Sequence, residues 1–447
     1  MQHLLHGPIL PTLLRLATPN VLAMLLTVGV SIAETYYIGR LGTTPLAAMA
    51  LVFPFAMLTQ MLSAGAMGGG VSAAVSRALG AGDVPRAETL ALHALAIGVG
   101  AGLLYSVIFL LFGPAFYRAL GGQGAVLAEA VRYSNWLFSG ALLVWLANTL
   151  ASILRGSGNM RVPSLTIFAT AILQIVLGGV LGLGAGPVPS FGMVGVALGH
   201  LVATGVSVVL FLAYLASARA RVRLRLGRFA LQRELLSDIL KVGALACLSP
   251  LQSVLASVIL TGLIARLGVQ ALAGYGIGQR LEFMLIPIAF GIGVASVPMV
   301  GMAMGARDVA RARHVAWVAA AVSAATLAVV GTAVALVPDL WAALFTSDAE
   351  VLEHARLYLR TAGWAYPLFG LGLTLYFASQ GSGKVLGPVL AGTLRLVLVA
   401  GVGAWLAAEG ATAGAYFALI AVAMVAYGLS TAAAVKWTRW VPPPPPR

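Results

Sequence analysis

The sequence predicts an all-α polytopic membrane protein, with twelve transmembrane helices in two six-helix repeats. Hydrophobic residues make up 60% of its 447 residues and charged residues only 9%. A soluble domain carries about 25% charged residues because its surface faces water. A chain with so few charges has a surface that must face lipid, and a mean hydropathy of +0.98 agrees with this. The repeats follow from a duplication within the chain, described below.

Apolar stretches of about 20 residues or more, bounded by Gly, Pro and Arg, predict the helices. The twelve predicted spans are 12–38, 46–77, 88–112, 128–154, 162–184, 191–217, 238–264, 271–303, 312–336, 351–379, 387–407 and 412–436. The first span is too long for a cleavable signal peptide. The single cysteine, Cys247, allows no intrachain disulfide and no cysteine-based metal site.

The distribution of Lys and Arg predicts the orientation. The connections after even-numbered spans hold fifteen basic residues, and those after odd-numbered spans, with adjoining helix ends, hold six. Basic loops stay on the cytoplasmic side, so both termini are expected in the cytoplasm. The net charge of +14 therefore indicates topology rather than nucleic-acid binding. The basic segment Arg219–Arg233 is either a topology anchor between two halves or, as the alternative, a patch that binds lipid or nucleic acid.

The chain repeats itself at a nearly constant offset. Ile38-Gly-Arg-Leu-Gly42 matches Ile264-Ala-Arg-Leu-Gly268 at an offset of 226. At an offset of 225, Gly80-Ala-Gly-Asp83 matches Gly305-Ala-Arg-Asp308, and Tyr133 matches Tyr358. Arg155-Gly-Ser-Gly158 matches Gln380-Gly-Ser-Gly383 at 225 as well. Both copies hold six spans and so have the same orientation, as in transporters that bind their substrate between two halves near the bilayer midplane. A purely structural duplicated bundle is the alternative.

The repeat and the charge runs predict the domain organisation. An N-terminal six-helix repeat is expected over 1–218, followed by a basic cytoplasmic linker over 219–237. A C-terminal six-helix repeat is expected over 238–440, followed by a proline-rich tail over 441–447.

The repeated motifs resemble those of the multidrug and toxic compound extrusion (MATE) transporters of bacterial type. The resemblance rests on Pro19 in the first span, on Glu34-Thr-Tyr-Tyr-Ile-Gly-Arg-Leu-Gly42, on Val75-Ser-Arg-Ala-Leu-Gly-Ala-Gly-Asp83, and on Leu154-Arg-Gly-Ser-Gly158. It covers essentially the whole chain. It implies a twelve-helix, V-shaped fold and cation-coupled export of amphiphilic, often cationic compounds. The expected partners are the lipid bilayer and small amphiphilic molecules, with no nucleic acid and a monomeric state.

Two carboxyl groups lie well inside the apolar spans, those of Glu34 and Glu282. A buried carboxylate costs several kcal/mol unless it is paired, solvated or protonated, so each is a functional candidate. MATE proteins characteristically carry an acidic residue, usually Asp, five positions before the glycine that is Gly39 here, and the resemblance implies that Glu34 takes part in cation coupling. Glu282 could bind a cationic substrate, carry a proton or form a structural ion pair. Some family branches carry further acidic residues in the seventh and tenth spans or in the fifth, but this chain has none deep in those spans, which favours proton over sodium coupling.

The remaining candidates have structural alternatives. Aromatic and amide side chains near the two carboxyl groups could contact substrate or simply pack in the core: Tyr36, Tyr37, Gln174, Tyr275, Gln279 and Phe283. Small or rigid residues are expected to allow close packing, bending and tight turns: Pro19, Gly68, Gly69, Gly70, Gly156, Gly158, Gly381 and Gly383. His200 is the one histidine clearly inside a predicted span.

The sequence contains no nucleotide-binding or hydrolase motif. Walker A, HExxH and GxSxG patterns are absent, so neither direct use of ATP nor enzymatic activity is expected. No cofactor or metal is expected, only the coupling ion, H⁺ or Na⁺. The favoured function is a secondary multidrug antiporter. The alternatives are a lipid-linked saccharide flippase of the same superfamily and, less favoured, an intramembrane enzyme.

Overall fold

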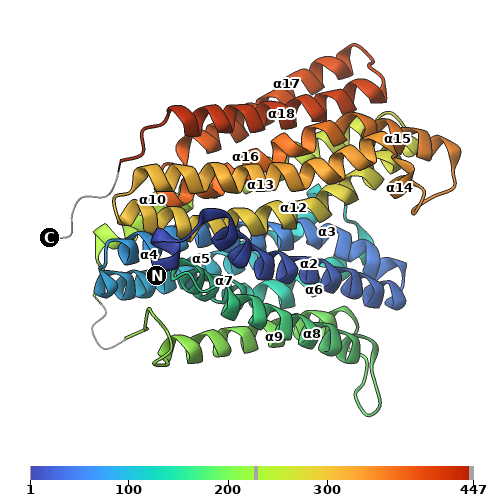
Figure 1. Ribbon diagram of the computed structural model, residues 1–447. Helices are drawn as coiled ribbons and strands as arrows, with labels where there is room; N and C mark the ends of the chain where they lie inside the picture. Colours follow the sequence, from blue (N-terminus) through green and yellow to red (C-terminus); the bar gives the residue numbers. More distant parts are fainter. Residues whose placement is uncertain (1, 226–229, 442–447) are drawn as a thin grey trace. The chain divides into compact units, whose positions relative to one another are not determined.

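The computed structural model describes residues 2–225 and 230–441. Residues 226–229 of the predicted linker, among them Arg228, and the proline-rich tail from 442 onward lie outside the described residues. Within the described ranges the long elements are all helices, as Figure 1 shows.

The first half of the chain contains nine α-helices and one π-helix in the described residues. They are α1 (Gln2–His6), α2 (Ile9–Leu41), α3 (Thr43–Gln60), the π-helix η1 (Met61–Met67), α4 (Gly68–Gly80), α5 (Val84–Ala119), α6 (Gly124–Ser139), α7 (Ala141–Gly156), α8 (Arg161–Leu183) and α9 (Gly192–Ala216). The predicted glycine-rich span 46–77 is therefore continuous but is wound as a π-helix just before Gly68.

The second half contains nine α-helices and one 3-10 helix in the described residues. Its elements are α10 (Arg233–Ala246), α11 (Leu248–Ala265), α12 (Val269–Gly305), α13 (Val309–Leu336), α14 (Asp339–Ala342), α15 (Ala349–Ala362), the 3-10 helix η3 (Gly363–Ala365), α16 (Tyr366–Ser382), α17 (Leu386–Ala408) and α18 (Ala413–Trp437).

The helices confirm the predicted all-α membrane class. In the described ranges, ten helical stretches are long and apolar enough to cross a membrane, and the bent pair α6–α7 raises this to eleven. The remaining predicted span, 351–379, coincides with α15 and α16, which η3 separates into pieces of 14 and 17 residues. Each piece is shorter than the roughly 20 residues that a straight helix needs to span a bilayer.

The predicted span 128–154 is not one straight helix. It is divided into α6 and α7, which meet at Gly140 with a bend of 43°. A Cβ at Gly140 would lie 2.1 Å from a methyl carbon of Leu201 on α9. The bend and the missing side chain together leave room for Leu201, a contact that no local sequence pattern could reveal.

The predicted span 238–264 is likewise divided, into α10 and α11 at Cys247. Pro250, three residues later, lacks the N–H that would bond to the carbonyl of Ala246, and its ring crowds that carbonyl. The Tyr376 hydroxyl donates a hydrogen bond to the Ala246 oxygen instead, at 3.0 Å. In a membrane interior such a freed carbonyl needs a partner of this kind.

Repeat-related positions have the same local structure. Gly158 and Gly383 follow the ends of α7 and α16 with φ of 79° and 77°, a backbone conformation that glycine adopts at little cost. Asp83 and Asp308 each accept a hydrogen bond at 2.9 Å, from the backbone N–H of Arg86 and of Arg311, and so cap α5 and α13. The duplication seen in the sequence is thus preserved in detail.

Replacing either capping aspartate with alanine is expected to lower the free energy of unfolding by about 1 kcal/mol, the usual value for a lost N-cap. Unfolding of the detergent-solubilised Asp83→Ala and Asp308→Ala variants would measure this. Asp83→Asn is the matched control, because asparagine caps about as well as aspartate. Unchanged stability of both alanine variants would contradict the capping role.

The chain forms two compact units, and the boundaries of these units differ from the boundaries of the two sequence repeats. One unit holds residues up to Val21 and those from Ala244 onward, and the other holds Leu22–Gly243. The boundaries predicted at 218 and 238 stay a prediction. Within each unit the repeat-related arginines make comparable contacts: Arg86 binds Asp238 of α10 at 2.6 Å, and Arg311 donates to the Gly7 carbonyl, ahead of α2, at 2.6 Å.

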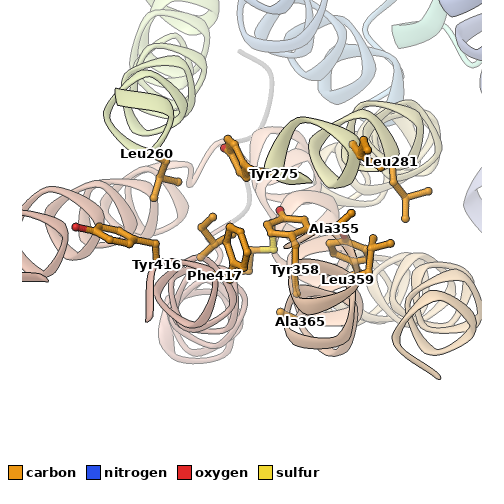
Figure 2. Packing of buried hydrophobic residues seen from close by; sticks show 14 of the residues in the cluster. Leu260, Tyr275, Leu281, Ala355, Tyr358, Leu359, Ala365, Tyr416 and Phe417 are labelled. Atoms are coloured by element: carbon orange, nitrogen blue, oxygen red, sulfur yellow. The ribbon is translucent and has the colours of Figure 1, made fainter. Parts of the chain in front are cut away.

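Each unit has its own hydrophobic core. In the Leu22–Gly243 unit the core includes Ile38, Phe109, Phe138 and Val196. In the other unit it includes Leu260, Tyr275, Leu281, Tyr358 and Phe417, which Figure 2 shows converging from several helices. The two membrane carboxyl groups of the sequence analysis fall into different units, Glu34 in the first and Glu282 in the second.

Candidate functional site: two intramembrane carboxyl groups

Glu34 is hydrogen-bonded to one polar side chain, which in turn contacts a second on another helix. It lies on α2, and the Gln174 side-chain nitrogen on α8 donates a hydrogen bond to its Oε1 at 2.7 Å. The same nitrogen lies 2.8 Å from Nδ1 of His200 on α9. The helices α8 and α9 run side by side in Figure 1 and are in extensive contact. The structure thus joins two predicted candidates, Glu34 and Gln174, with a third group that had no assigned role.

The tyrosines that follow Glu34 lie in different surroundings. Tyr37 packs on α8, where a Cβ at Gly179 would lie 3.1 Å from its ring. Tyr36 is 58% exposed, and its hydroxyl accepts a hydrogen bond from Arg40 at 3.3 Å. Tyr37 therefore has a packing role beside the Glu34 site, whereas Tyr36 faces outward from its unit.

Glu282 has a tyrosine partner. It lies on α12, and the hydroxyl of Tyr358 on α15 donates a hydrogen bond to its Oε1. The Tyr358 ring packs edge-on against Tyr275 and Phe417, with centroid distances of 5.6 Å and 5.2 Å. Figure 2 shows these rings together in the core. The carboxyl group is therefore held at one end of a buried aromatic cluster.

The other candidates near Glu282 divide in the same way. The Gln279 amide donates to the hydroxyls of Ser257, at 2.9 Å, and Tyr275, at 3.1 Å. It thereby links α12 to α11. Phe283 is 44% exposed, so its side chain lies on the surface of its unit rather than with the aromatic cluster. A substrate role for these residues stays a prediction.

Two cations in the predicted spans contact aromatic rings. Arg280 lies over Phe345 at 5.4 Å and Arg395 over Phe369 at 5.5 Å. Arg395 also lines a cavity of about 20 Å³ together with Gln252 and Tyr427. Such a volume holds about one water molecule. The Nε of Arg395 and the Oε1 of Gln252 have no protein partner among the described residues.

The glycine candidates fulfil two distinct requirements. Gly158 and Gly383 have left-handed backbone conformations just after α7 and α16, where tight turns were expected. Gly156 and Gly381, predicted to serve the same turns, instead lie within α7 and α16 against another helix. A Cβ at Gly156 would lie 2.8 Å from the Ser72 carbonyl oxygen, and one at Gly381 would lie 2.8 Å from that of Val297. Ser72 and Val297 are themselves 225 residues apart, so the repeat keeps this close approach.

The remaining predicted structural residues also lie at helix contacts. A Cβ at Gly68 would lie 2.5 Å from the Ser152 hydroxyl, and one at Gly70 would lie 2.8 Å from the backbone of Gly243. Gly69 is buried in α4. Pro19 lies inside α2, and the next residue, Asn20, donates to the Gly291 carbonyl at 3.2 Å.

Sequence reasoning missed Tyr358 and His200 as site residues. Tyr358 appeared only as a repeat partner of Tyr133, and His200 only as the one histidine inside a predicted span. Their positions along the chain gave no hint of their partners, because Tyr358 lies 76 residues from Glu282, and His200 lies 26 residues from Gln174 on another helix.

The two-repeat helical architecture, with carboxyl groups inside its spans, defines a polytopic membrane transporter. The MatE family model matches the chain twice, over residues 19–180 and 246–406. The chain belongs to this family, the MATE transporters. The family's members are transporters, so the protein is a transporter of small molecules in a lipid bilayer and not an enzyme. The double match agrees with the repeat.

Relatives extend over nearly the whole chain. The FAD transporter of Shewanella oneidensis is 26% identical over 398 residues, which are 89% of this chain and 87% of that protein. The multidrug export protein MepA of Staphylococcus aureus is 25% identical over 394 residues, covering 87% and 86%.

Solved structures show the same fold. A multidrug resistance MATE family transporter in an outward-facing conformation matches with a TM-score of 0.87 and 25% identity, covering 97% of this chain and 96% of that one. A MOP superfamily transporter from Pyrococcus furiosus, described as having a binding pocket of reverse polarity, matches with a TM-score of 0.88 at the same identity and coverage.

Proposed function

We propose that the protein is a secondary multidrug antiporter, which exports amphiphilic, often cationic compounds in exchange for protons by alternating access. The observation that carries this proposal is Glu34, a carboxyl group inside a membrane-spanning helix with an amide donor against it. Burial away from water favours the neutral form of a carboxyl group, so Glu34 can bind and release a proton as its surroundings change. Similarity to the export protein MepA supports multidrug export.

The partner of Glu34 supports protons over sodium. A sodium ion is coordinated by oxygen atoms, whereas the group 2.7 Å from Glu34 is a nitrogen that carries hydrogens. In this orientation the amide nitrogen stabilises a carboxylate but cannot bind a cation, and its oxygen faces Glu34 only when Glu34 is already protonated. The coupling ion that this arrangement favours is H⁺.

Purified protein in proteoliposomes tests the proposal. Export of ethidium, a cationic amphiphilic dye, is expected under an imposed proton gradient and not under a sodium gradient of equal size. Export driven by sodium alone would overturn the choice of ion. Failure of both gradients to drive ethidium or a second cationic dye would overturn multidrug export.

Export of a flavin nucleotide is a second candidate. The FAD transporter of Shewanella oneidensis is a relative over 89% of the chain, and the intramembrane cations Arg280 and Arg395 suit an anionic substrate. FAD uptake into the same proteoliposomes separates the two functions. FAD transport without dye transport would favour the flavin nucleotide.

We also propose that the protein lies in the bacterial inner membrane with both termini and the 219–237 segment in the cytoplasm. The Lys and Arg distribution supports this orientation. Ala230, an exposed residue near the end of this segment, provides a labelling position. Ala230→Cys in a Cys247→Ala background is expected to react with an impermeant thiol reagent only after the cells are opened. Labelling from outside intact cells would contradict the orientation.

Glu282 is expected to matter more for cationic than for neutral substrates. Glu282→Gln removes the negative charge but keeps an oxygen that can accept the Tyr358 hydrogen bond. The affinity for a cationic dye should fall about tenfold, equivalent to 1.4 kcal/mol, while binding of a neutral amphiphile changes little. Fluorescence titration of the purified variant measures both. An equal loss for the two substrates would favour a structural role for Glu282.

A further inference from the structure

The Gln174 amide lies between two groups that can exchange protons. Its side-chain nitrogen is 2.7 Å from Glu34 Oε1 and 2.8 Å from His200 Nδ1. An amide nitrogen carries two hydrogens, so it can donate to both atoms at once. This requires that Glu34 accept and that Nδ1 carry no proton. In this arrangement the neutral imidazole of His200 holds its proton on Nε2.

A second arrangement satisfies both contacts when the proton of Glu34 is on Oε1, the oxygen that faces Gln174. In that state the Oε1–H group of Glu34 must donate a hydrogen bond, and the amide nitrogen of Gln174 cannot accept one. Rotating the amide by 180° brings its oxygen to this position, and a carbonyl oxygen accepts two hydrogen bonds. His200 must then donate from Nδ1. If the Gln174 amide rotates without these proton changes, its oxygen faces the Glu34 oxygen. If His200 alone moves its proton to Nδ1, two N–H groups face each other. Both contacts are costly inside a membrane.

The surroundings contain few competing titratable groups. His200 lies on α9, which packs against α6, α7 and α8. The tyrosine of α6 is Tyr133, which is buried. One turn earlier on α6, Glu129 and Arg132 pair with each other. The titratable residues of α7 and α8 are Arg155 and Arg161, each within the terminal turn of its helix. Glu34 on α2 is thus the carboxyl group to which His200 is linked.

We propose that His200 is a positioning residue whose ring tautomer reports the protonation state of Glu34 through rotation of the Gln174 amide. One proton binds Oε1 of Glu34, the Gln174 amide rotates by 180°, and His200 exchanges its Nε2 proton for one on Nδ1 by way of water. The net uptake is one proton. Nε2 changes from donor to acceptor, so protonation of Glu34 on α2 alters the hydrogen bonding available to Nε2 of His200 on α9. The inference rests on the proposed proton coupling at Glu34.

Nuclear magnetic resonance of the purified, lipid-reconstituted transporter with ¹⁵N-labelled histidine tests this proposal. The nitrogen shifts distinguish the two neutral tautomers and the doubly protonated ring, and His200→Phe identifies the His200 signals. Infrared titration follows the protonated carboxyl band that is missing in Glu34→Gln. We expect His200 to change from the Nε2–H to the Nδ1–H tautomer at the same pH midpoint at which Glu34 is protonated.

Two variants show whether the amide carries the coupling. In Gln174→Met, Glu34 should still titrate but the His200 tautomer should no longer follow it. Gln252→Met, which removes an amide bonded to Thr393 in the other unit, should leave the common midpoint unchanged. The proposal is overturned if wild-type His200 keeps its tautomer or becomes doubly protonated while Glu34 titrates, a criterion that holds even if Gln174→Met does not fold. It is also overturned if the tautomer still follows Glu34 in Gln174→Met.

The result is independent of which compounds are exported. If the His200 tautomer follows Glu34 protonation but no dye is exported, the proposed substrates are rejected and the coupling between Glu34 and His200 is kept. If protons drive dye export but the His200 tautomer does not follow Glu34 protonation, the coupling between Glu34 and His200 is rejected and the antiporter function is kept.

Discussion

Glu34→Gln is expected to abolish proton-driven export while leaving the protein folded. Gln at position 34 mimics a permanently neutral carboxyl group, and its side-chain oxygen can still accept the hydrogen bond from Gln174. The local packing should therefore persist. What is lost is the change between charged and neutral forms, and without it the proton gradient has no group to act upon. Export of a dye against its concentration gradient should fall to the level of empty liposomes.

Glu34→Asp is the matched variant for this experiment. It keeps a carboxyl group but shortens the side chain by one methylene, which lengthens or breaks the 2.7 Å contact with Gln174. Partial export is expected. Dye binding by Glu34→Gln, measured by fluorescence, should remain and would show that the substrate site is intact. Export at the wild-type rate by Glu34→Gln would remove this residue from the mechanism and leave Glu282 as the candidate.

Gly156→Ala is expected to destabilise the Leu22–Gly243 unit strongly. The added Cβ would lie 2.8 Å from the Ser72 carbonyl oxygen and 3.1 Å from the Val75 Cβ on α4. These are backbone and near-backbone atoms, so neither can move aside without shifting a helix. Overpacking of this kind costs typically about 1–3 kcal/mol. Unfolding of the solubilised variant by heat or denaturant measures the loss.

The repeat offers a second test of this contact. Gly381→Ala should be destabilising in the same way, because its Cβ would lie 2.8 Å from the Val297 oxygen and 2.9 Å from the Val300 Cβ. Gly205→Ala is the control, since Gly205 lies in α9 with no atom within 4 Å of an added Cβ. Stability of Gly156→Ala equal to that of Gly205→Ala would show that α4 and α7 are not in close contact.

The sequence was informative where the membrane or the local backbone determines the structure. A bilayer requires about 20 apolar residues for each helical span, so the spans could be located from composition alone. The duplicated motifs have duplicated local structure: Gly158 and Gly383 lie in left-handed turns, and Asp83 and Asp308 cap helices. A turn or a cap depends on residues within a few positions, and such residues remain adjacent however the helices pack.

The tertiary structure alone decided which polar groups meet. Glu34 and Gln174 are 140 residues apart, and Glu282 and Tyr358 are 76 apart, so their pairing depends on which helix faces come into contact. The bend at Gly140 likewise involves a distant partner, Leu201, and the carbonyl that Pro250 frees beside the break at Cys247 is satisfied by the distant Tyr376. In lipid, apolar side chains on all sides of a helix are equally acceptable, so the hydrophobic pattern does not indicate which face points inward. Packing between small residues and hydrogen bonds between helices select that face, and both exist only in the folded protein.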